Sequence, residues 1–545
     1  MAEHLLFDCN ASFGPKVATY VEERWRRDEL LDDLDLAGIA GALVLHAQTL
    51  HYDPMLANLE LIEQIAAHRE RLFPCWMALP ALSGDFPDVP DFVAAARDHD
   101  VRAVRLEPQV FGLPLDETLW AELRDALRDE NMLVITSTDE GFGGDFAALD
   151  RFLSIFAGSP VLLLNAVWSQ WRNVMHLMNK HSQLHLEFSG FQANRAVEYC
   201  VDRYGAERCL FGTGLPRKAP GAARGFIDWS LLPDADVAKV AGMNLVRLLG
   251  GRGPTDVPTP GPWSDQLTAA ARQGRPLPCR VVDDHCHVLH DGGCCAGRER
   301  VMVDGGVDGM VELTRRIGVD CTAIMSWVGP LSGDVDRGNT IVANAVDRYP
   351  AEFVGVATVR PELQTPAEVA ATIGTYHVDR RFPGLKPFPR ITQDFDDPGF
   401  DGWFRFASDN RLYMVFDYLT SGPAGTPMVE HLTSRYPGMS LHLDHCARSW
   451  PYAKWAAEMV QRFPQVYAQL NYTLVTNGVI EYFVETVGAE RVLFGTDAPM
   501  RDPRPQAAWV VFTRLPETAK RLIFGANFER ILRGCFNGTY AQDLA

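Results

Sequence analysis

Short apolar runs alternate with amphipathic stretches along the chain. The runs GALVLHA (41–47), MLVITST (132–138) and PVLLLNA (160–166) are mostly apolar. The intervening stretch LWAELRDALRDEN (119–131) repeats its apolar residues at helical spacing. Strands that are apolar on both faces and separated by helices are typical of a parallel sheet covered by helices. The pattern therefore predicts repeated β–α units, arranged either as a (β/α)8 barrel or as an open, doubly wound sheet.

The same phrases occur twice in the chain. ERCLFGTGLP (207–216) is matched by ERVLFGTDAP (490–499), which lies 283 positions later. AGMNLVRLLGG (241–251) is matched by FGANFERILRG (524–534) at the same offset. Self-similarity at a fixed spacing indicates a repeated structural unit. The sequence therefore predicts two copies of one domain.

The predicted boundary lies near residue 260, where proline and glycine are frequent. We assign a first domain to residues 1–255, a Pro/Gly-rich linker to 256–278 and a second domain to 279–545. A length of about 250 residues per copy suits one (β/α)8 barrel. We therefore expect an α/β protein made of two tandem (β/α)8 TIM-barrel-like domains.

Composition and charge narrow the class of protein. With 47% hydrophobic and 22% charged residues, the chain has an ordinary globular composition. Its net charge of −19 argues against binding to the phosphate backbone of nucleic acids, because such binding needs clustered lysine and arginine residues. The first ten residues, MAEHLLFDCN, contain no basic region followed by an apolar run, and no stretch approaches about eighteen consecutive apolar residues. We therefore expect a cytoplasmic protein without a membrane or nucleic-acid partner.

A histidine pair marks the start of the second copy. In VVDDHCHVLHDGG (281–293), His285 and His287 alternate on one side of a predicted strand end, so that both can reach one ion. Asp497, in VLFGTDAP, follows a strand near the end of the same copy. Imidazoles and a carboxylate suit Zn²⁺ or a similar metal, although two exposed histidines alone would give the same local pattern.

Five phrases in order carry a resemblance to a known family: DDHCHV (283–288), GLKPFP (384–389), LHLDHCA (441–447), VLFGTDAP (492–499) and GANFERIL (525–532). This set resembles the amidohydrolase superfamily, in particular the branch that contains aminocarboxymuconate-semialdehyde decarboxylase. The resemblance implies the barrel fold, a bound zinc or manganese ion, and small-molecule substrates. It makes His285, His287 and Asp497 metal ligands and gives His445 a role in acid–base chemistry.

One position departs from the pattern of that family. The family has a histidine ligand on its fifth strand, where this sequence reads LYMVFDYLTSG (412–422). Asp417 could replace the missing imidazole as an oxygen ligand. Alternatively the metal has been lost, as in the metal-independent lactonase of the same family. We expect a metal held by two histidines and two aspartates.

The first copy has none of these ligands. Asn10 and Ser12 stand at the positions of His285 and His287, and Gly214 stands at the position of Asp497. Thr138 lies near the Asp417 position, and Asn165 or Ala166 lies near the His445 position. We therefore interpret the first domain as a non-catalytic barrel that supports the second. Because related barrels form homodimers, the resemblance also implies a homodimer as one arrangement of this chain.

The leading hypothesis for function is a metal-dependent hydrolase that acts on a C–N or C–O bond of a small anionic molecule. Asp497 would act as general base, and His445 would protonate a leaving group. Arg360, Lys386 and Arg448 are predicted near strand ends and could bind a substrate carboxylate. The alternatives are a non-oxidative decarboxylase using the same metal site, a metal-independent lactonase-like hydrolase, and a scaffold without catalysis.

Overall fold

The computed structural model divides into two compact units. It describes residues 3–15, 20–259, 261–297, 300–387, 394–417 and 422–540. Unit 1 comprises Met1–Gln192 and Ala196–Ser264, and unit 2 comprises Ala193–Arg195 and Asp265–Ala545. Within the described residues, no helix combines the length and the apolar character needed to cross a bilayer.

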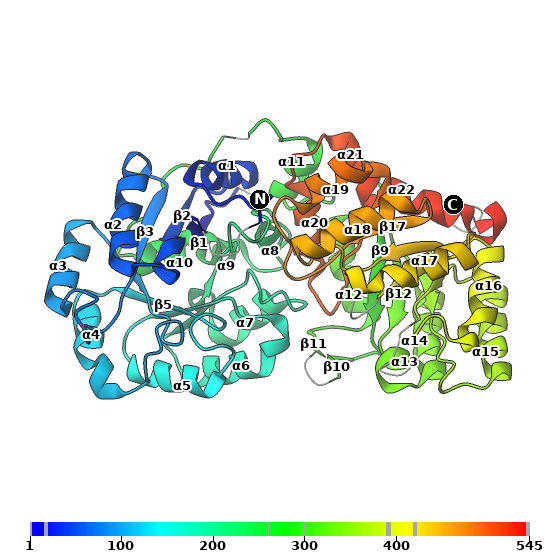
Figure 1. The fold of residues 1–545 in the computed structure, drawn as a ribbon, viewed down its shortest axis with the longest axis horizontal. Coiled ribbons are helices and arrows are strands. Elements are labelled where there is room, and N and C mark those ends of the chain that lie inside the picture. The colour runs from blue at the N-terminus through cyan, green and yellow to red at the C-terminus, as the bar shows by residue number, and fades with distance from the viewer. Residues whose placement is uncertain are drawn as a thin grey trace. The chain divides into compact units, whose positions relative to one another are not determined.

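Unit 1 contains one parallel sheet whose strand order follows the sequence from β1 to β8. Its strands are β1 (Phe7–Phe13), β2 (Gly41–His46), β3 (Leu72–Met77), β4 (Ala103–Arg105), β5 (Leu133–Ser137), β6 (Val161–Leu164), β7 (Leu184–Glu187) and β8 (Cys209–Leu210). Its α-helices are α1 (Arg27–Ala37), α2 (Pro54–Ile65), α3 (Val89–Asp98), α4 (Glu117–Asp129), α5 (Phe146–Ile155), α6 (Trp171–Lys180), α7 (Ala196–Tyr204), α8 (Gly225–Asp228), α9 (Asp234–Ala238) and α10 (Asn244–Leu248). Figure 1 shows helices between successive strands of this unit.

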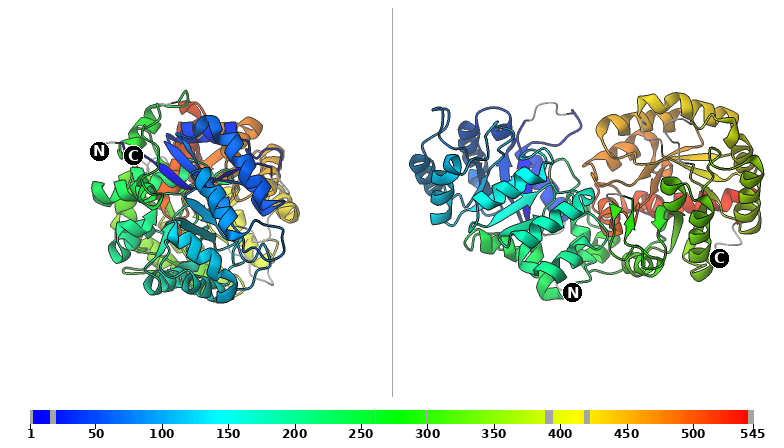
Figure 2. Two further views of the ribbon diagram at one scale, coloured as in Figure 1. Left: turned by 90° about the vertical axis from the view of Figure 1, so that its left-hand side faces the viewer. Right: turned by 90° about the horizontal axis from the view of Figure 1, so that it is seen from below.

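Unit 2 repeats this arrangement. The eight strands of its large sheet are β9 (Val282–Val288), β12 (Cys321–Ser326), β13 (Phe353–Ala357), β14 (Gly384–Leu385), β15 (Tyr413–Phe416), β16 (Ser440–Leu443), β17 (Val466–Leu470) and β18 (Val492–Phe494). A small antiparallel pair consists of β10 (Cys295–Ala296) and β11 (Arg300–Val301). The α-helices are α11 (Gln266–Arg272), α12 (Val307–Ile317), α13 (Val328–Ser332), α14 (Val335–Arg348), α15 (Pro366–Thr372), α16 (Asp401–Asp409), α17 (Thr426–Arg435), α18 (Trp450–Arg462), α19 (Val479–Val487), α20 (Pro503–Val511), α21 (Glu517–Arg521) and α22 (Asn527–Gly534). In the views of Figure 2 the strands of each unit lie inside a layer of helices.

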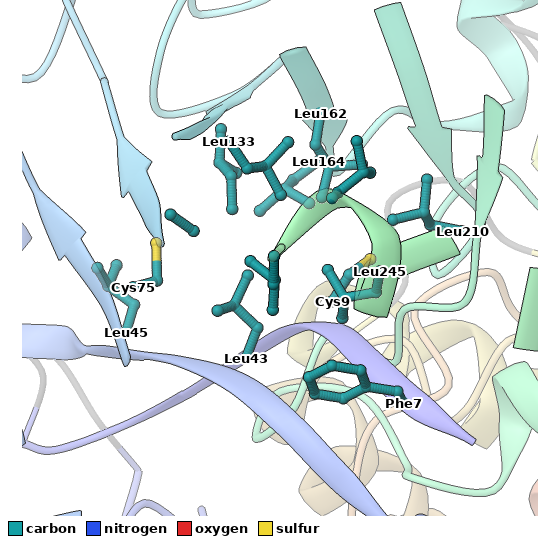
Figure 3. Packing of buried hydrophobic residues seen from close by; sticks show 14 of the residues in the cluster. Phe7, Cys9, Leu43, Leu45, Cys75, Leu133, Leu162, Leu164, Leu210 and Leu245 are labelled. Carbon is teal, nitrogen blue, oxygen red and sulfur yellow. The ribbon is translucent and has the colours of Figure 1, made fainter. Parts of the chain in front are cut away.

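The strands are buried on both faces, as their continuous apolar sequences predict. Every residue of β2, β5 and β6 is buried. Side chains from the inner faces of the first sheet meet in one apolar cluster, which Figure 3 shows around Leu43, Leu133 and Leu162. A filled interior of this kind is typical of a (β/α)8 barrel.

Each sheet closes on itself through its first and last strands. In unit 1 the amide of Cys9 donates to the carbonyl of Phe211, and Ala11 forms a parallel bridge with Leu215. In unit 2 Cys286 forms the corresponding bridge with Ala498. The two (β/α)8 TIM-barrel-like domains predicted from the sequence are therefore confirmed, and the open doubly wound sheet is wrong.

A buried aspartate and a threonine form a closing pair across each of these junctions. The Thr213 hydroxyl donates to Asp8 in unit 1, and the Thr496 hydroxyl donates to Asp283 Oδ2 over 2.6 Å in unit 2. Burial raises the pKa of Asp8 to about 6 and that of Asp283 to about 7. The two closing pairs thus place equivalent hydrogen bonds at equivalent positions of the repeat.

The first long helix of each unit ends in the same way. Gly38 follows α1 with φ 64°, and Gly318 follows α12 with φ 95°. A left-handed backbone at this position costs glycine little, because glycine has no Cβ. The chain can therefore turn directly from these helices into β2 and β12.

A buried histidine of unit 2 is expected to make the fold sensitive to acid. The Trp403 indole donates to His377 Nε2 over 2.7 Å, and His377 Nδ1 lies 2.6 Å from the carbonyl of Phe382, so the ring is held in its neutral form. Burial lowers the pKa of His377 from its ordinary 6.5 to about 4. The folded state therefore binds this proton less readily than the unfolded chain. The stability from this group is fully present above pH 6.5 and is lost as the pH falls through about 4.

We expect His377→Gln to flatten this acid dependence. Between pH 6.5 and pH 4, the free energy of unfolding should fall by up to about 3 kcal/mol less in the variant than in the wild type. Denaturant unfolding over a pH series measures the difference, and His290→Gln, at an exposed position of the same unit, is the control. Equal acid sensitivity in wild type and His377→Gln would contradict the prediction.

Candidate metal centre and active site

Three donor atoms of unit 2 face one another at the carboxyl ends of its first and last strands. His285 and His287 both lie on β9, and their Nε2 atoms are 3.1 Å apart. Asp497 follows β18, and its Oδ1 lies 3.1 Å from His287 Nε2 and 3.8 Å from His285 Nε2. All three side chains are at most 1% exposed. The sequence spacing therefore brings these three residues together as one donor set.

Hydrogen bonds fix the orientation of the His285 ring. His285 Nδ1 lies 2.9 Å from Gln469 Oε1, and Gln469 Nε2 donates to Asp284 Oδ2 over 2.6 Å. Because the Gln469 carbonyl oxygen can only accept, His285 Nδ1 carries the proton and Nε2 has the free lone pair. A hydrogen bond of this kind behind a metal-binding histidine holds the ring in the orientation that ligation needs.

His287 is held by packing on one face. The Trp327 ring stacks on it with a centroid distance of 4.0 Å. Burial and the nearby His285 lower the pKa of His287 well below its ordinary value. Its imidazole is therefore neutral at physiological pH, which is the form that binds metals. No described residue makes a hydrogen bond with its Nδ1.

Asp497 has a strained backbone and a single charged partner in the described structure. Its φ of 56° lies in the left-handed region, where the first unit has Gly214 with φ 75°. Neither of its carboxylate oxygens accepts a hydrogen bond from a described residue, but Oδ2 forms an ion pair with Arg501. Oδ1 faces the two histidines. A buried carboxylate oxygen directed at two lone pairs fits a position for a cation.

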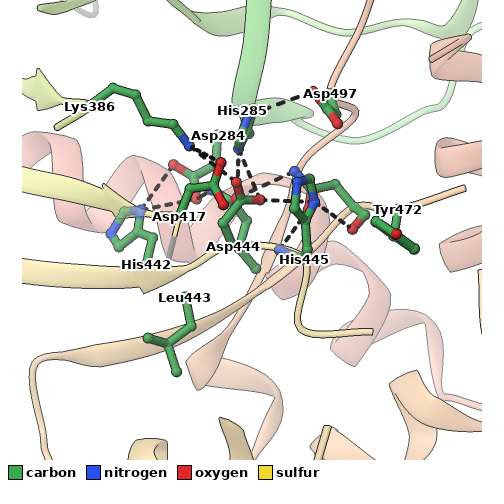
Figure 4. A network of polar contacts seen from close by, with 12 residues as sticks. Asp284, His285, Lys386, Asp417, His442, Leu443, Asp444, His445, Tyr472 and Asp497 are labelled. Atoms are coloured by element: carbon green, nitrogen blue, oxygen red, sulfur yellow. Dashed lines mark hydrogen bonds and ion pairs between the residues drawn. The ribbon is translucent and has the colours of Figure 1, made fainter. Parts of the chain in front are cut away.

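A second polar group lies next to this donor set (Figure 4). Asp417, Asp444 and His445 also place donor atoms within 4.8 Å of one another. Asp444 Oδ1 lies 3.3 Å from His285 Nδ1 and 3.2 Å from His445 Nδ1. The structure thus places Asp417, the predicted fourth ligand, with Asp444 and His445 rather than with the three residues above.

An ammonium group and two imidazole N–H groups surround Asp444. Although burial opposes ionisation, His285 Nδ1, His445 Nδ1 and the Lys386 ammonium face the carboxylate and hold the pKa of Asp444 well below its ordinary value. Burial lowers the pKa of His445 to about 4. His445 Nδ1 lies 2.9 Å from Asn471 Oδ1, so Nδ1 donates and Nε2 carries the lone pair of a neutral ring.

The three predicted substrate-binding cations have different surroundings. Lys386 is 1% exposed and forms ion pairs with Asp417 and Asp444. Arg360 is equally buried and pairs with Glu362, two residues along the chain. Arg448 is partly exposed, and its guanidinium lies 4.2 Å from the centroid of the Tyr452 ring. Lys386 is thus joined to two carboxylates of the site, whereas Arg360 is engaged by Glu362.

Arg501 is the main residue that the sequence analysis missed. It is 3% exposed, donates through Nε to Thr473 Oγ1 over 2.6 Å and pairs with Asp497. The signal was present, because an arginine four residues after an acidic residue can pair with it even outside a regular helix. The importance of Asp444 and Gln469 had no such local signal, since Asp444 follows β16 and Gln469 lies on β17, both far from β9 in the sequence.

Unit 1 fills the equivalent place with a different polar network. Asn10 Nδ2 donates to Glu187 Oε1 over 3.2 Å and to Asn165 Oδ1 over 3.1 Å. Lys218, at the position of Arg501, donates to Ser189 Oγ over 3.1 Å. Within the described part of unit 1, no three His, Cys, Asp or Glu residues come close enough to hold an ion.

Comparison with protein families gives one match, and it covers the second unit. Residues 282–534 match the family model for amidohydrolases. Comparison with curated protein sequences finds no match.

Several solved structures are similar to half of the chain. A 5-carboxyvanillate decarboxylase from Sphingomonas paucimobilis is 18% identical, with a TM-score of 0.38 over 47% of this chain and 99% of that one. A dihydroxybenzoic acid decarboxylase from a Polaromonas species, solved with manganese and an inhibitor, is 15% identical, with a TM-score of 0.37 over 46% and 96%. An uncharacterised TIM-barrel protein from Bordetella bronchiseptica is 18% identical, with a TM-score of 0.39 over 46% and 98%.

Proposed function

We propose that unit 2 is a metal-dependent enzyme acting on a small anionic molecule, and the match of residues 282–534 to the amidohydrolase family model supports this. The observation that carries this proposal is the convergence of His285 Nε2, His287 Nε2 and Asp497 Oδ1 in a buried position. Two imidazoles and a carboxylate suit a borderline divalent ion such as zinc or manganese. Such an ion would act there as a Lewis acid on an oxygen of the substrate.

The charge balance of the site supports an anionic substrate. Three carboxylates and two cations lie around the donor set: Asp417, Asp444, Asp497, Lys386 and Arg501. A divalent ion added to this group makes its net charge positive. A substrate carboxylate would then be attracted into the site and would neutralise the remaining charge.

Burial favours decarboxylation over hydrolysis as the reaction. The donor side chains are at most 1% exposed and Arg501 is 3% exposed, so a bound carboxylate exchanges water for fixed charges. In non-oxidative decarboxylation the bond to the carboxyl carbon breaks, its electron pair stays on the substrate, and a proton replaces the CO₂. In the transition state the negative charge of the carboxylate is spread over more atoms. Entering the buried site therefore costs the transition state less hydration than it costs the carboxylate of the ground state.

Hydrolysis of a C–N or C–O bond is the second candidate, because the site also holds a pair of proton-carrying groups. Asp497, the carboxylate of the donor set, pairs with Arg501 and can take a proton from water. His445 is a neutral imidazole with a lone pair on Nε2, and it can orient or protonate a leaving group after taking up a proton. The same residues therefore serve either reaction, and the substrate decides between them.

The first unit has a supporting role in this proposal. Asn10 stands at the position of His285, and Asn165 stands near the position of His445. Their hydrogen bonds are made within the network around Glu187. We infer that unit 1 neither binds the metal nor catalyses the reaction.

The purified protein is expected to contain about one divalent ion per chain, because unit 2 alone offers a complete donor set. Elemental analysis measures the ion. Release of CO₂ from hydroxybenzoates, the compounds named for the similar decarboxylases, is compared with cleavage of small amides and lactones. Full activity in a rigorously metal-free preparation would contradict the metal-dependent proposal and support the lactonase-like alternative.

A further inference from the structure

The group formed by Asp417, Asp444 and His445 has the composition of a second cation position. Asp417 follows β15, and Asp444 and His445 follow β16, so the carboxyl ends of two neighbouring strands bring them together. Asp444 is fully buried, and its Oδ1 accepts no hydrogen bond from the described residues. Two carboxylates and one imidazole are ligands that manganese and zinc both accept.

A lysine from a third strand fills this position. Lys386 follows β14, and its Nζ lies 3.1 Å from Asp444 Oδ2 and 3.4 Å from Asp417 Oδ2. Figure 4 shows the lysine side chain directed at the two carboxylates. Its side chain is 1% exposed, so the ammonium group is held among these carboxylates and away from water.

The second position is separate from the first but shares a neighbour with it. His285 directs Nε2 at His287 and Asp497, and its Nδ1 lies 3.3 Å from Asp444 Oδ1. The two positions therefore lie on opposite sides of the His285 ring. A cation at either position would therefore change the electrostatic potential at the other, because Asp444 lies beside the His285 ring.

We propose that Asp417, Asp444 and His445 form a second cation position, and that the Lys386 ammonium occupies it in place of a metal ion. Lys386 thereby limits the active site to a single divalent ion. This inference rests on the proposed metal at His285, His287 and Asp497.

Simple electrostatics explains why the lysine excludes a metal. The ammonium is attached to the barrel, so its local concentration at the carboxylates far exceeds that of a free ion. A divalent ion among the same oxygens would lie within a few ångströms of a positive charge in a buried site, where repulsion is weakly screened. Without the ammonium, the Asp444 and Asp417 carboxylates would share one site with no cation bound to them by an ion pair given above, an arrangement that attracts a cation.

The position of Lys386 in the sequence suggested that it binds a substrate carboxylate. The proposal gives it a different role. Two protein carboxylates already neutralise its charge. Arg501, on the other side of Asp497, then remains as the protein cation nearest to the donor set in the described structure.

Metal counting in three proteins tests the proposal. Wild type, Lys386→Met and Lys386→Arg are loaded with Mn²⁺, freed of excess ion by gel filtration and analysed for manganese per chain. Lys386→Met should bind about twice as much as wild type, because the vacated carboxylates take up a second ion. Lys386→Arg keeps a cation and should match wild type. Magnetic coupling between the two ions should appear in the electron paramagnetic resonance spectrum of Lys386→Met alone.

A second substitution shows where the extra ion binds. Asp417→Asn added to Lys386→Met should return the manganese content to the wild-type level, since it removes one of the donors. Lys386→Gln serves in place of Lys386→Met if circular dichroism shows that the latter is unfolded.

The outcomes separate this inference from the proposed function. A wild type that binds no manganese would contradict the proposed metal-dependent function. A wild type with one ion and a folded Lys386→Met or Lys386→Gln also with one ion would overturn the role of Lys386. Two ions in the wild type would overturn it as well.

Discussion

Replacing Asp497 with asparagine is expected to lower turnover by about 10³-fold or more while the fold is kept. The substitution removes the negative charge that faces His285 and His287, together with the group proposed to carry protons. It hardly changes side-chain volume. Asparagine also tolerates the left-handed backbone at this position, where φ is 56°. The loss should therefore be one of chemistry and metal affinity, with little loss of structure.

The stability of Asp497→Asn is a part of the same prediction. In the metal-free protein neither oxygen of this carboxylate accepts a hydrogen bond from a described residue, so its replacement should change the melting temperature little. The control is Asp228→Asn in unit 1, which removes a buried carboxylate that accepts two hydrogen bonds from Arg224. That control should lower the melting temperature and leave turnover intact. Near-native turnover of Asp497→Asn on its true substrate would show that the working site lies elsewhere.

Replacing both His285 and His287 with alanine is expected to abolish metal binding and activity together. The two Nε2 atoms supply two of the three donors, and Asp497 alone offers a single carboxylate. Elemental analysis should find less than about a tenth of an ion per chain, because the remaining donor has no chelating partner at this position. His51→Ala, at an exposed position of unit 1, is the control and should leave the metal content unchanged.

The repeat provides a milder form of the same experiment. His285→Asn with His287→Ser copies Asn10 and Ser12, which the first barrel accommodates with its strands closed. This variant should fold as well as the wild type and still lose the metal. Metal that remains bound in either double variant would reveal a site outside the proposed centre.

The sequence was sufficient for the fold and for the three facing donors. Repeated phrases at a fixed offset predicted two like barrels, and each copy has its own sheet of eight parallel strands. His285 and His287 could be paired because alternate residues of a strand share a side. Asp497 could be added because the barrel brings the last strand beside the first. These inferences needed only local spacing and strand order.

The partners of the cations could not be predicted in this way. Arg360 was a candidate for substrate binding, but it pairs with Glu362 in the structure. Lys386 approaches Asp444, which is 58 residues away in the sequence. A long side chain can pair with any of several nearby charges. The pairing depends on distances of a few tenths of an ångström, and strand order does not specify these. The missing fifth-strand histidine shows the same limit, since Asp417 lies close to the site but with a different set of neighbours.

The closing pairs also bear on how the chain folds as it is made. Asp8 and Thr213 are 205 residues apart, and Asp283 and Thr496 are 213 residues apart. Neither barrel can therefore close until its last strand has left the ribosome, and such long-range contacts form slowly. The first barrel has its complete set of strands before His285 is synthesised, and N-terminal domains generally fold first during synthesis. The barrel proposed to bind the metal is thus completed after the first barrel, which can already be folded by then.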